Sequence, residues 1–198
     1  MLGVEGVTRA LFTHASAALP GRVAELRARY GASVGVLPDF AKIYPDEINT
    51  LSIEKFPALA ITIPATTGKI DNRQTDIDAT FEEYSYRYTV QLFAYAVADN
   101  SAATSKAIKR YTLAVREAFL ANKILPVDDT GDTAQVDPQT LVESYSELDK
   151  KDSKFIAASF VQFEIVTTER LYFPARFGTD PAVIELGAAL EEHPHFNE

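Results

Sequence analysis

The sequence contains no cysteine, which excludes disulfide bonds and metal sites built on thiolates. It contains only three histidines, His14, His193 and His195. The last two follow Glu191 and Glu192, and such a group of imidazoles and carboxylates could hold a metal. We expect no metal site there, because no third ligand stands nearby and the intervening proline breaks helical spacing. His14 falls within a predicted amphipathic helix, where we expect a partly buried structural side chain.

Long apolar segments are also missing. Residues 1–19 are apolar in part, but Glu5, Arg9 and His14 interrupt them. This stretch therefore fits neither the apolar region of a signal peptide nor a membrane span. No other part of the sequence is apolar over a comparable length. We expect a chain that is soluble, is not secreted by an ordinary signal peptide and has no membrane partner.

Basic residues are scarce. The sequence has 28 acidic and 19 basic residues, which gives a formal net charge of −9. Because a sequence-independent DNA-binding protein needs clustered lysine and arginine, this balance argues against one. Two predicted helices carry basic groups, which are Arg22, Arg27 and Arg29 in the first, and Lys106, Lys109, Arg110 and Arg116 in the second. Solvated helix faces are the preferred interpretation; the alternatives are a phosphate-binding site for the first group and an acidic partner for the second.

Sequence motifs of catalysis are absent as well. There is no glycine-rich phosphate loop, no Gly-x-Ser-x-Gly elbow and no His-Glu-x-x-His pair. Glu82 and Glu83 are neighbours in a predicted strand, so they point to opposite faces and do not form an acid–base pair. The spacing of Asp71, Asp76 and Asp78 does not match a calcium loop, and a solvated loop is preferred. We therefore predict that the protein is not an enzyme, with no catalytic, cofactor-binding or metal-binding residues and no cofactor.

The strongest pattern that is present is a long alternating segment, Thr80–Val97. Apolar and aromatic side chains occupy one side of it, which are Tyr84, Tyr86, Tyr88, Val90, Leu92, Ala94 and Ala96. Polar residues occupy the other side, so the pattern predicts a strand with one buried face. It is far longer than most strands, which stop near ~5–6 residues, so it must bend, bulge or project. For its three tyrosines, a packed aromatic face is preferred over a base-stacking platform.

Before this strand, the sequence predicts two helices, an irregular connection and a short strand. A helix over residues 2–19 is ended by Pro20-Gly21, and a second short helix, Arg22–Tyr30, stops at Gly31. The connection over 32–56 is long enough to carry function or to wrap a neighbour. The apolar pattern of residues 56–64 predicts a short, largely buried strand that ends at Pro64. A polar segment, Ala65–Ala79, then leads to the long strand as an extended hairpin loop or a projecting arm.

After the long strand, a helix over Ser101–Asn122 begins with Ser101 as its N-cap and is expected to pack across the apolar sheet face. An acidic loop (126–138), a short strand (141–146) and a charged turn (147–154) follow it. Residues 155–170 form a second long strand, expected to pair antiparallel with the first. Its shared face carries Phe155, Ala157, Val161, Phe163 and Ile165.

These elements predict an α+β fold: an antiparallel or mixed sheet with long strands, packed on one side by two main helices, plus a C-terminal extension. We assign residues 1–170 to one α+β domain and residues 171–198 to the extension. The extension is expected to contain a short amphipathic helix over Pro181–Glu192. Its apolar residues are Val183, Ile184, Leu186 and Leu190.

The order of elements resembles the tail-terminator and tail-completion (head–tail joining) proteins of long-tailed bacteriophages. The resemblance is carried by Phe56-Pro57-Ala58-Leu59-Ala60-Ile61, then Tyr88-Thr89-Val90-Gln91-Leu92, then Lys109-Arg110-Tyr111 in the following helix, and the turn and strand YSELDKKDSKFIAASFVQFEI. It covers roughly residues 1–170 and consists of a pattern of elements. Residues 171–198 depart from the compact family pattern, which leaves a different role at the head–tail junction open.

The resemblance implies a structural virion protein of the tail or neck, assembled in the cytoplasm of the bacterial host. It implies a homo-oligomeric ring, a hexamer, that caps the tail tube and meets the tail tube protein and the head connector or neck proteins. DNA would pass through the lumen without specific binding, repelled by acids such as those of the loop Ala65–Ala79. That loop and the C-terminal tail are the expected contact surfaces. A tail tube or other neck subunit is the alternative, and an α+β enzyme or ligand-binding protein remains a further one.

Overall fold

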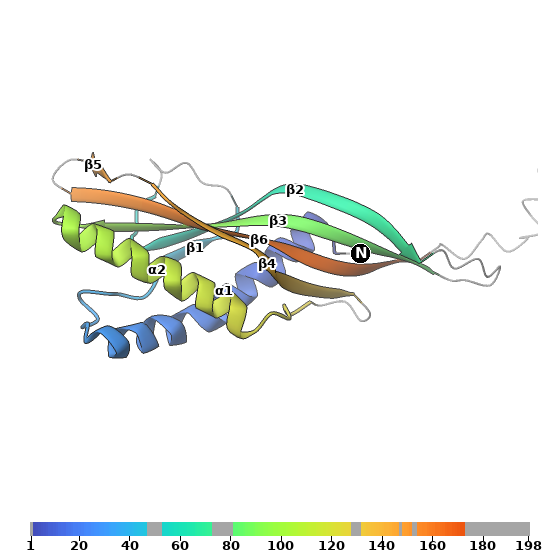
Figure 1. Cartoon of the computed structure of the whole chain (residues 1–198), viewed down its shortest axis with the longest axis horizontal. Helices are drawn as coiled ribbons and strands as arrows, with labels where there is room; N and C mark the ends of the chain where they lie inside the picture. Colours follow the sequence, from blue (N-terminus) through green and yellow to red (C-terminus); the bar gives the residue numbers. More distant parts are fainter. Residues whose placement is uncertain are drawn as a thin grey trace, which may run out of the picture.

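The computed structural model of the chain describes residues 2–46, 53–72, 81–127, 132–146, 148–151 and 154–172. It contains two helices, α1 (Gly3–Tyr30) and α2 (Ser101–Ala121), on one side of a six-stranded sheet (Figure 1). The strands are β1 (Lys42–Tyr44), β2 (Ala58–Asn72), β3 (Phe81–Ala98), β4 (Thr133–Tyr145), β5 (Asp149–Lys151) and β6 (Lys154–Tyr172). The predicted α+β fold, with two helices on a mixed sheet of long strands, is confirmed.

The sheet is organised around its two longest strands. Its order is β1-β2-β3-β6-β4, and β5 pairs with the first residues of β6. β3 and β6 pair antiparallel along their whole length, from Phe81 opposite Tyr172 to Ala98 opposite Phe155. The two predicted long strands and their antiparallel pairing are therefore confirmed. Only β1 runs parallel to its neighbour, β2, which makes the sheet mixed.

The core lies between the helices and one face of the sheet. Alternate residues of β3 and β6 point into it, as the period of 2 predicts: Tyr88, Val90, Leu92, Ala94, Ala96, Ala157, Val161, Phe163 and Ile165 are buried. Phe119 of α2 packs against Phe163 with ring centroids 5.3 Å apart and against His14 of α1 at 4.8 Å. His14 is 6% exposed and lies 3.1 Å from the carbonyl oxygen of Ala118, so its predicted structural role is confirmed.

The prediction of two N-terminal helices is wrong, because α1 runs without a break through Pro20. Proline removes one helical hydrogen bond and crowds the preceding turn, which normally ends a helix. Here Leu19, Val23 and Leu26 are all buried against the same core, on both sides of the proline. Continuous packing of this face outweighs the local penalty. The predicted end is confirmed: Gly31 adopts a left-handed φ of 60° as the C-cap.

Two strands continue into segments that were predicted as loops, for a shared reason. In the described part of Ala65–Ala79, which ends at Asn72, the structure agrees with the alternative of a projecting arm. β2 does not stop at Pro64 but continues to Asn72, and β4 begins at Thr133 inside the predicted acidic loop. Pro64 lies where the β2–β3 register shifts between Thr62 and Ala65, and Pro138 lies where the β4–β6 register shifts between Asp137 and Val142. At both prolines one side of the strand has no paired neighbour among the described residues, so a proline at such a bulge need not break the ladder and the strand continues beyond it.

Smaller differences concern element ends. The side chain of Asn100, not Ser101, caps α2 by accepting a hydrogen bond from the backbone N–H of Ala103 at 2.8 Å. Part of the predicted charged turn forms β5, and β6 extends two residues past Arg170 to Tyr172. The predicted helix over residues 181–192 lies outside the described residues.

Candidate functional site

One end of the sheet continues past α2 and, at its tip, past the first turn of α1 (Figure 1). We call this part the arm: β2 from Ala65 to Asn72, β3 from Phe81 to Arg87 and β6 from Val166 to Tyr172. β1 pairs only with Ala58–Ala60, so within the described residues the outer edge of β2 in the arm has no partner strand. Residues 64–68 along this edge are exposed. The arm therefore has a strand edge that is open to a partner.

The arm is fastened to the helical layer by Glu169 of β6, a fully buried carboxylate. One carboxylate oxygen, Oε2, accepts hydrogen bonds from the backbone N–H groups of Leu2 at 2.9 Å and Gly3 at 3.3 Å. The other, Oε1, accepts from the hydroxyls of Tyr88 at 2.8 Å and Thr167 at 2.9 Å. A buried charge needs such partners, because an unpaired one would be expelled.

Glu169 also replaces a local cap for α1. The N-cap residue Leu2 has no side chain that can accept a hydrogen bond from the first turn. A carboxylate at the N-terminus of a helix satisfies these N–H groups and interacts favourably with the helix dipole. The first turn of α1 thus depends on a residue 167 positions away in the chain.

Two tyrosines are buried, one in the sheet and one in a helix. Tyr88 donates to Glu169, and Tyr111 of α2 donates to the carbonyl oxygen of Pro38 at 2.7 Å. Burial is the main cause that raises the pKa of both phenols above the usual value, and the hydrogen bond to Glu169 adds to the effect at Tyr88. Both phenols therefore stay protonated in the folded protein over a pH range in which the unfolded chain loses these protons.

We expect the free energy of unfolding to fall as pH rises above about 10, the pKa of a tyrosine in the unfolded chain. Below that pH both states keep the protons and these groups cause no pH dependence. Above it, each buried tyrosine lowers stability by up to about 1.4 kcal/mol per pH unit. Urea unfolding across this range checks the slope. Tyr88→Phe should reduce it, whereas an unchanged slope would contradict the account; Tyr30→Phe, which removes a phenol that is 45% exposed, is the control.

The tyrosine row of β3 packs along the arm. Tyr84 and Tyr86 stack with ring centroids 6.2 Å apart, and Tyr88 is only 2% exposed. Tyr86 covers Gly68 of β2, where an added Cβ would lie 2.6 Å from its ring. Glycine is needed there because the aromatic ring approaches the backbone closely. This geometry supports a packed aromatic face, because Tyr88 is buried and the half-buried Tyr84 and Tyr86 pack against each other and against β2.

The opposite face of the sheet carries paired charges. Arg87 donates to Glu164 at 2.7 Å and to Asp137 at 3.1 Å, which holds the pKa of Asp137 below its usual value. Arg170 donates to Glu83 at 2.9 Å on this face, while Glu82 accepts from Tyr84. Glu82 and Glu83 thus have separate partners, as the strand geometry predicts. These pairs fix the strands without forming a reactive site.

The first predicted basic group is neutralised within the chain. Arg22, Arg27 and Arg29 pair with Glu25, Asp39 and Glu117 respectively. Such pairing favours the structural interpretation over a phosphate-binding site. In the second group, Arg116 pairs with Glu143, whereas Lys106 and Arg110 line a cleft at the other end of the sheet.

The remaining candidates give no metal or catalytic centre in the part of the chain that the structure describes. Asp71 lies in β2, not in a loop, while Asp76, Asp78, His193 and His195 lie outside the described residues. The described residues contain no group of histidines and carboxylates placed to hold a metal. Among the described helices, none is both long and apolar enough to cross a membrane.

No protein-family model matches the sequence, and a comparison with curated proteins found no match. The residues and their geometry must therefore carry any functional assignment. Glu169, the residue that joins the arm to α1, was not predicted from the sequence. The signal that could have found it is its place on the buried face of β6, two positions after Thr167 and in phase with Phe163 and Ile165.

Proposed function

We propose that this chain is a structural virion protein of a long-tailed bacteriophage: a tail terminator that forms a ring, caps the tail tube and joins it to the head connector. The resemblance in the order of elements is the starting point. Its partners would be copies of itself in a hexamer, the tail tube protein and the neck proteins. The protein would assemble in the bacterial cytoplasm and act in the tail or neck of the virion.

The observation that carries this proposal is the arm. Its outer edge in β2 is a row of backbone groups that lack a partner strand among the described residues. A protein that works alone usually covers or charges such an edge, because it invites pairing with other chains. An arm held by the buried Glu169 and open along its edge suits a protein that holds neighbouring subunits.

The charge distribution supports the passage of DNA without specific binding. The chain has a net charge of −9, and Arg22, Arg27, Arg29 and Arg116 are already paired with carboxylates. Tight contacts to phosphates need cationic side chains that are available to displace counterions. A ring of such subunits would present an acidic surface that repels DNA instead of gripping it.

Light scattering and electron microscopy of the purified protein test the ring. We expect single closed rings whose mass stops increasing with protein concentration, or rings that form when tail tubes are added. Head-to-tail contacts that close by rotation stop at a ring, whereas contacts that do not close give filaments. Long filaments would favour the alternative of a tail tube subunit. A chain that stays monomeric at high concentration, with or without tubes, would contradict the proposal.

A further inference from the structure

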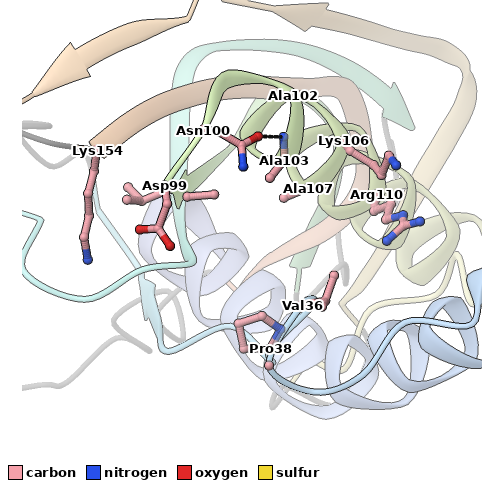
Figure 2. Close-up of a pocket in the computed structure, with 13 residues that line it drawn as sticks. Val36, Pro38, Asp99, Asn100, Ala102, Ala103, Lys106, Ala107, Arg110 and Lys154 are labelled. Carbon is pink, nitrogen blue, oxygen red and sulfur yellow. Dashed lines mark hydrogen bonds between the residues drawn. The ribbon is translucent and has the colours of Figure 1, made fainter.

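A cleft of about 600 Å³ opens at the end of the sheet opposite the arm. Its lining combines small or apolar side chains with charged ones at the sides. Ala102, Ala103 and Ala107 of α2 face Val36 and Pro38 of the segment that follows α1 (Figure 2). These side chains form one apolar wall of the cleft, which can contact aliphatic side chains.

Three of the four charged side chains that line the cleft are cationic, in a chain whose net charge is negative. Lys106 and Arg110 lie on one flank, and Lys154 and Asp99 on the other (Figure 2). The guanidinium of Arg110 lies 4.6 Å from the centre of the Tyr30 ring, which holds it in place. Within the described residues, neither Lys106 nor Lys154 forms an ion pair. The cleft is thus a cationic, partly apolar site in a chain whose net charge is −9.

This combination selects a partner that is both acidic and apolar. A nucleic acid backbone would use the cations but not the apolar wall, and a purely apolar segment would leave the lysines without a role. An amphipathic acidic peptide uses both. The chain itself contains such a sequence: residues 181–192 carry Val183, Ile184, Leu186 and Leu190 together with Glu185, Glu191 and Glu192.

We infer that the cleft binds residues 181–192 of a second copy of this chain. The inference rests on the self-association in the proposed function and names two of the surfaces that would meet. In a ring, each copy would then offer its cleft to one neighbour and its C-terminal segment to another, which is a head-to-tail contact.

The same chain's own segment is poorly placed to dock as a helix along the whole cleft. β6 has 19 residues, from Lys154 at the cleft to Tyr172 at the tip of the arm, and spans about 60 Å at ~3.3 Å per residue. From Tyr172 to Pro181 the chain can reach at most about 30 Å. The helix expected over residues 181–192 adds about 18 Å. This total, about 48 Å, is less than the length of β6, whereas the segment of another copy has no such limit.

Disulfide trapping provides a direct test, because the full chain has no cysteine of its own. Ala103→Cys places a thiol in the cleft, and Ala189→Cys places one in the C-terminal segment. When the two single variants are mixed under mild oxidation, we expect a disulfide-linked dimer that contains one copy of each. Ala121→Cys, at the other end of α2 and also exposed, is the matched control; its yield with Ala189→Cys should be several-fold lower.

A charge swap tests the electrostatic part of the contact. Lys106→Glu with Lys154→Glu should lower the yield of the trapped dimer several-fold, and so should Glu191→Lys with Glu192→Lys. Combining the altered cleft on one copy with the altered segment on the other should restore much of the yield. Lys109→Glu, an exposed change on α2 outside the cleft lining, should leave the yield unchanged.

The results of these experiments distinguish a failure of the proposed contact from a failure of the proposed ring. Equal yields of trapped dimer with Ala103→Cys and Ala121→Cys would contradict the proposed contact. Yields that do not change with the charge swap would contradict it as well. If the unmodified chain still formed rings, the proposed function would stand without it. A specifically trapped pair in a protein that never grows beyond a dimer would support the contact and contradict the ring.

Discussion

Replacing Glu169 with alanine should lower the free energy of unfolding by about 3 kcal/mol. The change removes the acceptor for the backbone N–H groups of Leu2 and Gly3 and for the hydroxyls of Tyr88 and Thr167. These donors lie where water cannot fully replace the carboxylate, since Glu169 itself is 0% exposed. Urea unfolding at a fixed protein concentration measures the loss.

The matched control is Glu164→Ala, which removes the same side chain from the same strand on the opposite face. Glu164 pairs with Arg87, which is half exposed and keeps Asp137 as a second partner, so the loss should stay below about 1 kcal/mol. Glu169→Gln keeps the shape but loses the charge and should fall between the two. Equal losses for Glu169→Ala and Glu164→Ala would show that the buried carboxylate does not hold the arm to α1.

Replacing Phe119 with alanine should lower the free energy of unfolding by about 4 kcal/mol. Phe119 is 0% exposed and lies between His14 of α1 and Phe163 of β6, so its ring joins both helices to the sheet. Its removal leaves a cavity where these three elements meet, which adds to the loss of buried apolar surface. Urea unfolding again measures the change.

Phe12→Ala, in α1, is the control for Phe119→Ala. Phe12 is 37% exposed, so its truncation removes less packing and should change stability by less than about 1 kcal/mol. If the two truncations had similar effects, the layer between α1, α2 and β6 would not be the core that the fold requires.

Elements with a clear period could be predicted from the sequence. α2, β3 and β6 each bury one regular face, and their positions were right to within a few residues. Regular patterns are informative because burial of one face is what fixes these elements in the fold. The apolar faces of these elements also predicted that α2 packs on β3 and β6.

Elements that contain proline could not be predicted well. Pro20, Pro64 and Pro138 all marked predicted ends, yet α1, β2 and β4 continue through them. In each case tertiary structure decides: packing on both sides of Pro20, and register shifts at the two strand prolines. These features depend on neighbours distant in the sequence, which local propensity does not report.

The arm and its anchor illustrate the same limit for the candidate site. The sequence indicated a strand too long for a compact domain, but not that β2 would accompany it. Glu169 is one carboxylate in an alternating strand, and only the fold brings it to Leu2. Only part of the cationic cleft could be predicted: the sequence places Lys106 and Arg110 on α2. Lys154 lies near them because β6 begins at the cleft.

The most direct test of the proposed role is the position of the protein in an intact virion, determined by cryo-electron microscopy of particles that carry it. The account predicts one ring of this chain at the head-proximal end of the tail, between the tail tube and the connector. Density along the whole tube would identify a tube subunit instead. Absence of the protein from purified virions would contradict the account.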